Sequence, residues 1–221
     1  HVWVLINGGP GSGIHKTTDR GQSWTEVKAG LPSNQMGRIG LAGAPSDPNM
    51  LYAIIEASDE EKGVYRSTNF GETWEKRSSY MTTSPQYYNE IVVDPINSDR
   101  IYALNTFTMK SEDGGSTFAP LTTQWRHVDD HALWIDPDNT QHLYIGGDGG
   151  IYESWDRGNT WRHLRNLSIT QFYRIQPDYV EPFYNVCGGT QDNNSLCGPS
   201  RTTNVHGITN SDWKVVLGGD G

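Results

Sequence analysis

The chain has 221 residues, including 25 glycines, 8 tryptophans and 11 tyrosines, and its formal net charge is −9. The negative charge argues against nucleic acid or an anionic membrane surface as a main partner. No apolar run approaches the ~18 residues that a membrane-spanning helix needs, so membrane insertion is not expected. The many glycines and aromatic residues fit one large β domain with many turns.

An eight-residue motif occurs four times along the chain, starting at Thr17, Ser67, Ser111 and Ser154. Each copy has a small hydroxylated residue, then Asp or Asn, then Gly, then Ser or Thr followed by an aromatic residue. Successive copies begin 50, 44 and 43 residues apart. A period in this range, built from short strand-like runs, is typical of a β-propeller. We therefore expect an all-β fragment of about five four-stranded antiparallel blades.

The motif has a recognisable structural role. Its Asp or Asn accepts hydrogen bonds from nearby backbone NH groups, its Gly supplies a positive φ, and its Ser or Thr closes the turn. The motif resembles the Asp-box (BNR repeat) of sialidases, xyloglucanase-type glycosidases and sortilin-type propellers. In those families it is a folding device on the face away from the active site. The resemblance implies a structural role for Asp19, Asn69, Asp113 and Asp156.

A second recurrence aligns the blades, because a Pro precedes each Leu/Ile/Phe-Tyr pair at a constant spacing. Pro ends one strand and the Asn/Asp-rich stretch after it turns the chain into the next. The opening segments 2–9 and 13–16 are then the second and third strands of a first blade. Later second strands are expected at 51–56, 101–105, 142–146 and 183–188. Later third strands are expected at 63–66, 107–110 and 150–153.

The last part of the chain does not follow this spacing. Only 30 residues separate Phe183 from Trp213, and no Asp-box falls between them. Two interpretations stay open: the last blade is reduced, or residues 213–221 open a further blade. We expect residues 1–221 to be an incomplete propeller segment whose parent protein continues at both ends and supplies the remaining blades.

The two cysteines, Cys187 and Cys197, flank a turn-rich stretch. A disulfide between them would close a short loop and add about 2–3 kcal/mol. Such a bond indicates an oxidising compartment, so we expect a secreted, extracellular or periplasmic protein. The alternative is a pair of buried thiols. Their spacing does not suit a zinc knuckle.

Blade topology sorts the polar residues by face. The Asp-boxes join third strands to fourth strands, so the loops between blades and between second and third strands must emerge at the opposite face. This argument gathers aromatic, acidic and imidazole residues on one rim, where they suit glycan recognition. The predicted ligand-binding residues are Glu90, His127, Asp129, His131, Gln191, Asp192 and Asp220, with Tyr87, Tyr88 and Arg126 nearby.

Two carboxylates on this rim could perform acid/base hydrolysis of a glycoside. Asp130 and Asp148 are the candidate catalytic pair, and one of them would need a raised pKa. The alternative for Asp148, within Gly-Gly-Asp-Gly-Gly, is a turn residue that bonds its own backbone. The same structural alternative applies to Asp192.

Residues 127, 129 and 131 would share one side of an extended strand and could present His, Asp and His to a metal ion. The sequence shows no clear fourth ligand, so hydrogen bonding or substrate contact are the preferred roles. We expect no metal and no cofactor. The run Tyr173-Arg174-Ile175-Gln176-Pro177 is similar to an arginine-bearing motif of sialidases. It follows the Asp-boxes instead of preceding them, and no arginine trio accompanies it, so sialidase activity is not expected.

The segments 131–137, 146–152 and 189–193 resemble large secreted bacterial propellers grouped with sortilin-type domains and xyloglucanase-like enzymes of glycoside hydrolase family 74. No segment matches the surroundings of that family's catalytic aspartates, so no catalytic assignment transfers. Two functions remain. One is a secreted binding propeller for an extracellular glycan or polypeptide. The alternative is a glycoside hydrolase that acts on a polysaccharide through two carboxylates.

Overall fold

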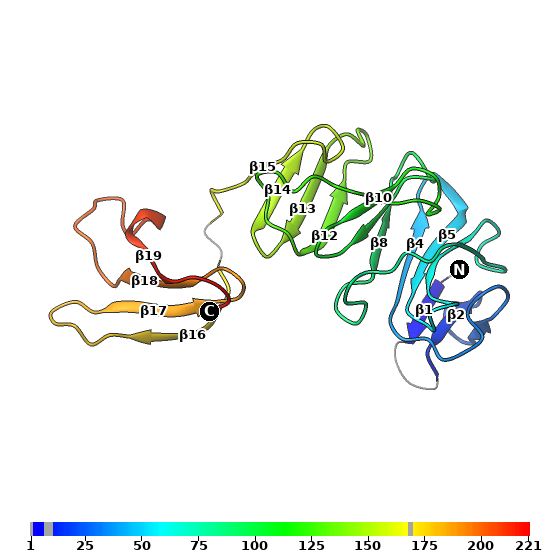
Figure 1. Ribbon diagram of the computed structural model, residues 1–221, viewed down its shortest axis with the longest axis horizontal. Coiled ribbons are helices and arrows are strands. Elements are labelled where there is room, and N and C mark those ends of the chain that lie inside the picture. The colour runs from blue at the N-terminus through cyan, green and yellow to red at the C-terminus, as the bar shows by residue number, and fades with distance from the viewer. Residues whose placement is uncertain (1, 7–10, 168–169) are drawn as a thin grey trace. The chain divides into compact units, whose positions relative to one another are not determined.

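A computed structural model describes residues 2–6, 11–167 and 170–221. The described part is all-β, apart from one short 3₁₀ turn at Asn210–Asp212. Its strands form five sheets in which consecutive strands lie side by side (Figure 1). No helix in these described ranges is long and apolar enough to cross a membrane.

The first sheet has three strands, and the next two sheets have four strands each. The first contains β1 (Val2–Ile6), β2 (Gly13–Thr17) and β3 (Thr25–Val27). The second contains β4 (Ile39–Ala44), β5 (Asp47–Ile55), β6 (Gly63–Ser67) and β7 (Glu75–Ser78). The third contains β8 (Glu90–Val93), β9 (Ile101–Leu104), β10 (Met109–Ser111) and β11 (Ala119–Pro120).

The last two sheets have four strands each. The fourth contains β12 (Asp130–Ile135), β13 (Leu143–Gly147), β14 (Gly150–Ser154) and β15 (Arg162–His163). The fifth contains β16 (Phe172–Pro177), β17 (Asn185–Thr190), β18 (Ser195–Pro199) and β19 (Lys214–Leu217). The meander of short antiparallel strands is the blade pattern that the repeat of 43 to 50 residues predicted, and the all-β propeller assignment is confirmed.

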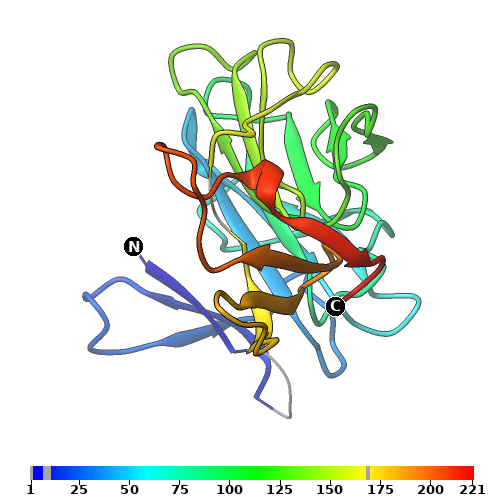
Figure 2. The ribbon, with the colours of Figure 1, turned by 90° about the vertical axis from the view of Figure 1, so that its left-hand side faces the viewer.

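Most expected strands are found within a few residues of their predicted bounds. The predicted second and third strands at 51–56 and 63–66 are β5 and β6, which pair with Leu51 opposite Ser67. The fifth sheet differs from both interpretations of the last segment. It is not reduced, and β19 closes it as its fourth strand, alongside β18 (Figure 2). The missing Asp-box is replaced by a longer connection that carries the 3₁₀ turn.

The described chain divides into two compact units. Unit 1 comprises residues 1–147 and 151–162, and unit 2 comprises residues 148–150 and 163–221. Unit 1 therefore contains the first four sheets, and unit 2 contains the fifth sheet.

Apolar side chains between neighbouring sheets hold unit 1 together. One cluster joins the second and third sheets through Tyr52, Ile54, Ile91 and Ile101, among others. Burying such a side chain contributes about 1.5–3 kcal/mol. The Tyr52 hydroxyl satisfies its own hydrogen-bonding need by donating to the Ser98 carbonyl at 2.9 Å. The repeated Leu/Ile-Tyr pair thus serves to join one blade to the next.

The first strand of each four-stranded blade is called the inner strand here. The inner strands β4 and β8 of neighbouring blades approach each other even more closely. A Cβ atom built on Gly40 of β4 would lie 2.0 Å from the carbonyl oxygen of Asn89. Asn89 is fully buried, and its side-chain amide donates to the carbonyls of Arg38 and Ile54. Glycine is required at position 40 because the backbone before β8 occupies the space of a side chain.

Candidate functional site

The four Asp-box turns have nearly identical hydrogen bonds. In the third sheet, Asp113 Oδ1 accepts from the backbone NH of Thr117 at 2.9 Å, and Oδ2 accepts from the Thr117 hydroxyl at 2.7 Å. The Ser111 hydroxyl donates to Asp113 and accepts from the Gly115 NH. These bonds to the ionised carboxylate hold the pKa of Asp113 at about 2. The corresponding contacts recur around Asp19, Asn69 and Asp156.

Both residues at the tip of each turn have left-handed backbone. The glycines Gly21, Gly71, Gly115 and Gly158 have φ between 73° and 88°. The preceding residues Arg20, Phe70, Gly114 and Arg157 have φ between 57° and 67°, which the sequence did not reveal. The carboxylate or amide oxygens bond within their own turn in every copy, which leaves them little capacity for a ligand.

Strand register fixes which end of each sheet faces away from these turns. Asp130 at the start of β12 lies opposite Gly147, whereas Asp156 follows the far end of β14. Glu90 lies opposite Leu104, whereas Ser111, which begins an Asp-box, lies opposite Ile101. The ends away from the Asp-boxes form what we call the loop rim. In unit 1 it includes residues 87–90, 105–108 and 125–131.

Asp130 lies on this rim but points into the interior. Its side chain is 2% exposed and forms an ion pair with Arg126, whose side chain is 0% exposed. Its Oδ2 also accepts from the Thr108 hydroxyl at 2.7 Å. Burial raises the pKa of Asp130, although Arg126 and Thr108 oppose that shift. Asp130 is thus enclosed by its ion pair and its hydrogen bond, and its catalytic pairing with Asp148 stays a prediction.

Asp129, by contrast, belongs to an aromatic cluster on the rim. The Tyr88 hydroxyl donates to Asp129 Oδ1 at 2.5 Å. The His131 ring stacks on Tyr88 with centroids 5.4 Å apart, and Tyr87 contacts both rings edge-on. Asp129 is in the left-handed region at φ 66°. The structure therefore brings Asp129, His131 and Tyr88 together.

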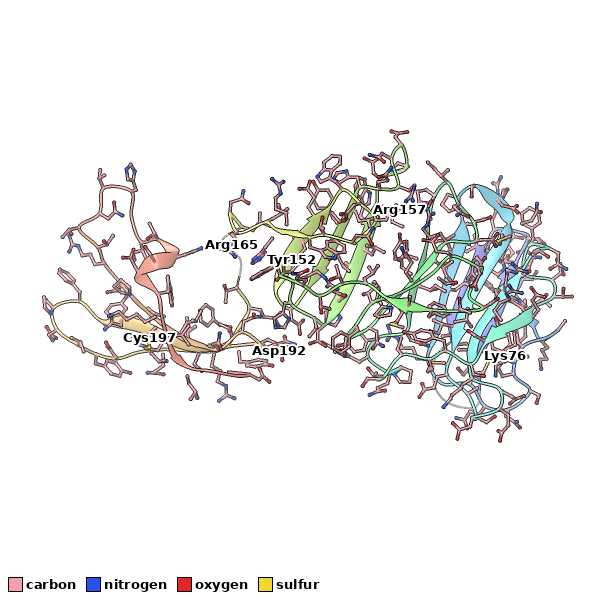
Figure 3. All side chains as sticks on the ribbon, turned by 45° about the horizontal axis from the view of Figure 1, so that its top comes forward. Lys76, Tyr152, Arg157, Arg165, Asp192 and Cys197 are labelled. Carbon is pink, nitrogen blue, oxygen red and sulfur yellow. A yellow bond between two sulfur atoms is a disulfide. The ribbon has the colours of Figure 1, made fainter. Side chains whose placement is uncertain are left out.

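The other predicted rim residues of unit 1, His127 and Glu90, make different contacts. The backbone NH of His127 donates to the Tyr152 hydroxyl at 3.1 Å (Tyr152 is labelled in Figure 3). The His127 ring Nδ1 is 2.8 Å from the Val128 carbonyl oxygen. Glu90 is exposed and lies 3.9 Å from Arg38. His127 thus makes local contacts through its backbone NH and its ring, and Glu90 makes a long ion pair.

Sequence reasoning overlooked Trp125, which lies four residues before Asp129. Its side chain is 85% exposed, and its φ of 61° is unusual for a bulky residue. Tyr87, in the neighbouring loop of the rim, is 52% exposed. A tryptophan within the polar run Thr-Thr-Gln-Trp-Arg-His, outside any strand, is the sequence signal that could have indicated an exposed aromatic residue.

Unit 2 contains the remaining predicted carboxylates. The backbone NH of Asp192 donates to Asp220 Oδ1 at 3.0 Å, and the Tyr173 hydroxyl lies 3.4 Å from Asp220 Oδ2. The Asn193 amide donates to the carbonyls of Asp148 and Gln191. The carbonyls of Asp148 and Gln191 thus share the Asn193 amide, and the backbone of Asp192 bonds to the Asp220 carboxylate (Asp192 is labelled in Figure 3).

Cys187 and Cys197 form a disulfide between β17 and β18, where they lie opposite each other. The alternative of two free thiols is excluded by this bond. Across residues 2–6, 11–167 and 170–221, no group of three or more His, Cys, Asp or Glu side chains is placed to hold a metal ion. His127, Asp129 and His131 therefore do not form such a group.

No protein-family model matches the chain. A xyloglucanase, Xgh74A of Acetivibrio thermocellus, is 25% identical over 178 residues, which cover 67% of this chain and 21% of that protein. A xyloglucanase of a Paenibacillus species is 24% identical over 204 residues, covering 79% of this chain and 19% of that protein. The chain thus spans about a fifth of the length of these curated relatives.

Solved structures agree on the fold. The GH74 enzyme of Niastella koreensis superposes with a TM-score of 0.60 at 17% identity, covering 97% of this chain and 35% of that structure. The GH74 xyloglucanase of Xanthomonas campestris gives a TM-score of 0.54 at 17% identity, covering 84% and 33%. The chain is a β-propeller segment with Asp-box turns that resembles the xyloglucanases of glycoside hydrolase family 74.

Proposed function

We propose that this chain is part of a secreted propeller and binds an extracellular glycan at the loop rim of unit 1. The observation that carries the proposal is the exposure of Tyr87 and Trp125 in two neighbouring loops of that rim. The CH groups on one face of a pyranose ring carry partial positive charge and stack on the electron-rich faces of aromatic rings. Asp129 adds an acceptor for sugar hydroxyl groups.

Backbone strain supports the choice of this rim. Trp125 and Asp129 both have left-handed backbone and lie in the same loop. Such conformations persist where the surrounding structure fixes them, and they cluster at binding sites. The similarity to xyloglucanases makes a β-glucan polysaccharide the first ligand to test. The disulfide of unit 2 fits an oxidising, extracellular compartment.

Isothermal titration of the protein with soluble xyloglucan tests the proposal. We expect Trp125→Ala to weaken binding by about tenfold or more, equivalent to roughly 1.4 kcal/mol. Trp24→Ala is the matched control, because Trp24 is also exposed but belongs to an Asp-box. Equal affinities of Trp125→Ala and the unmodified protein, across xyloglucan and other β-glucans, would overturn the proposal. Binding of a peptide instead of any glycan would also overturn it.

Glycoside hydrolysis is a second candidate function. It is favoured by the names of the similar proteins and by the proximity of Asp192 and Asp220 in unit 2, where the Asp192 backbone NH donates to the Asp220 carboxylate. Hydrolases need two carboxyl groups about 5–5.5 Å apart for retention or 6.5–9.5 Å apart for inversion. Release of reducing sugar from xyloglucan, lost in Asp192→Asn and Asp220→Asn but kept in Asp113→Asn, would support this function. Binding without any sugar release would overturn hydrolysis by residues of this chain alone.

A further inference from the structure

The loop that carries Trp125 is closed at its base by a buried ion pair. Arg126 and Asp130 are four residues apart, and their side chains turn inward and pair with each other. Arg126 Nη1 also donates to the His127 carbonyl at 3.1 Å, and the guanidinium lies over the Trp161 ring, 5.2 Å from its centroid. The segment between the paired residues contains Asp129, which has left-handed backbone, and Trp125, the other left-handed residue of the loop, directly precedes it.

Hydrogen bonds near the same pair connect the loop to two sheets of unit 1. Asp130 accepts from Thr108, which lies between β9 and β10. The backbone NH groups of Asp129 and Asp130 donate to the carbonyls of Thr106 and Asn105. On the other side, the NH of His127 donates to the Tyr152 hydroxyl of β14. The loop is therefore held between the third and fourth sheets at several points.

Stability alone does not account for a buried ion pair at this place. Removing two charges from water is costly, and apolar residues of similar volume are often equally stabilising or better. The Arg126 atoms Nε and Nη2 have no hydrogen-bond partner among the described residues, which adds to that cost. The hydrogen bond from Arg126 to the Asp130 carboxylate is directional, however, so the pair restrains the course of the backbone between its two residues. Trp125, directly before the pair, keeps an unfavourable φ and an exposed ring.

We propose that Arg126 and Asp130 are positioning residues. They hold the loop of residues 125–130 in the conformation in which the side chains of Trp125 and Asp129 can contact the glycan. The inference rests on the proposed function of the loop rim. It gives Asp130 a role through the loop instead of the catalytic role that its sequence position suggested. Neither side chain touches ligand, because both are buried.

The double variant R126M/D130L tests this role. It replaces the ion pair with apolar side chains, so we expect a melting temperature within about 4 °C of the original. We expect its affinity for xyloglucan to fall by about tenfold, because the loop is no longer held in one conformation. Trp125→Ala is measured in parallel. If Trp125→Ala binds normally, the proposed function fails; if only the double variant binds normally, the positioning role fails.

A second measurement covers the case in which the double variant does not fold. Asp130→Asn keeps an acceptor for Thr108 but removes the charge that pairs with Arg126. In a ¹H–¹⁵N spectrum, with the indole signal of Trp125 assigned through Trp125→Phe, we expect that signal to shift or broaden in Asp130→Asn. The indole signal of Trp24 serves as the internal reference. An unchanged Trp125 signal together with unchanged affinity would overturn the inference.

Discussion

The Tyr88 hydroxyl donates a hydrogen bond of 2.5 Å to Asp129 Oδ1, which joins the loop before β8 to the loop before β12. The bond adds to the apolar contacts and to the hydrogen bonds of Asp130 with Thr108 and Asn105 that also join these two sheets. Asp129 has left-handed backbone, and the Tyr88 ring that bonds to it stacks on the His131 ring. The geometry of the loop rim therefore depends on a contact between residues 41 positions apart.

Tyr88→Phe removes this bond and keeps the ring. Because a hydrogen bond to a charged acceptor is lost, we expect the free energy of unfolding to fall by about 1.5–3 kcal/mol. Urea denaturation measures the change. Tyr87→Phe is the control and should change it by less than about 0.5 kcal/mol, since Tyr87 is exposed. Equal losses in the two variants would contradict a specific role of the Tyr88–Asp129 bond.

The Asp-box turns should respond differently to two substitutions of Asp113. Asp113→Ala removes the acceptor for the NH and hydroxyl of Thr117, so we expect a loss of about 1–2 kcal/mol in urea denaturation. Asp113→Asn should lose less, because Asn69 makes the equivalent contacts to Thr73 in the second sheet. An Asn variant as unstable as the Ala variant would show that charge, and not geometry, holds the turn.

Stability in acid should depend on Glu153. Hydrogen bonds from Tyr144, His142 and Arg162 lower the pKa of Glu153 from its ordinary 4.5 to about 2. A carboxyl whose pKa is lowered by folding contributes stability above the unfolded pKa, and that contribution is lost as the pH falls toward the folded pKa. We expect Glu153→Gln to reduce the fall in unfolding free energy between about pH 4.5 and 2. An unchanged pH profile would contradict this assignment.

Two glycines of β4 offer a matched comparison. In Gly40→Ala the new Cβ would meet the Asn89 carbonyl oxygen at 2.0 Å, so the second and third sheets must separate or shift. We expect a loss of roughly 3 kcal/mol or more. In Gly43→Ala the nearest atom is the flexible Leu51 Cδ2 at 3.4 Å, so thermal melting should change little. Similar melting of the two variants would contradict the close approach of the inner strands.

The features that the sequence predicted well are local ones. An Asp-box completes its hydrogen bonds within eight residues, so Asp19 and Asp156 could be placed without knowledge of the rest of the chain. The Pro and Tyr spacing likewise marks strand ends and strand starts within each blade. Repetition then extended these local rules to most of the sheets.

The features that could not be predicted from the sequence depend on contacts between distant segments. The enclosure of Asp130 requires Thr108, which is 22 residues away, and the inward turn of Arg126. Sequence position alone made Asp130 an exposed rim carboxylate. The fourth strand of the last sheet was missed for a similar reason. Nothing around Lys214 indicates that β19 returns to β18 after a long connection.

The self-contained Asp-box turns have a consequence for how the chain folds. The third and fourth strands of a blade are joined by a turn whose bonds close over only a few residues, so this hairpin can form on the microsecond scale of isolated hairpins. The first strands of the blades also pack against neighbouring blades, as β4 does against β8, so their full set of contacts requires segments far apart in the sequence. During synthesis the outer hairpins are therefore expected to appear first, one blade after another, before the sheets pack against each other.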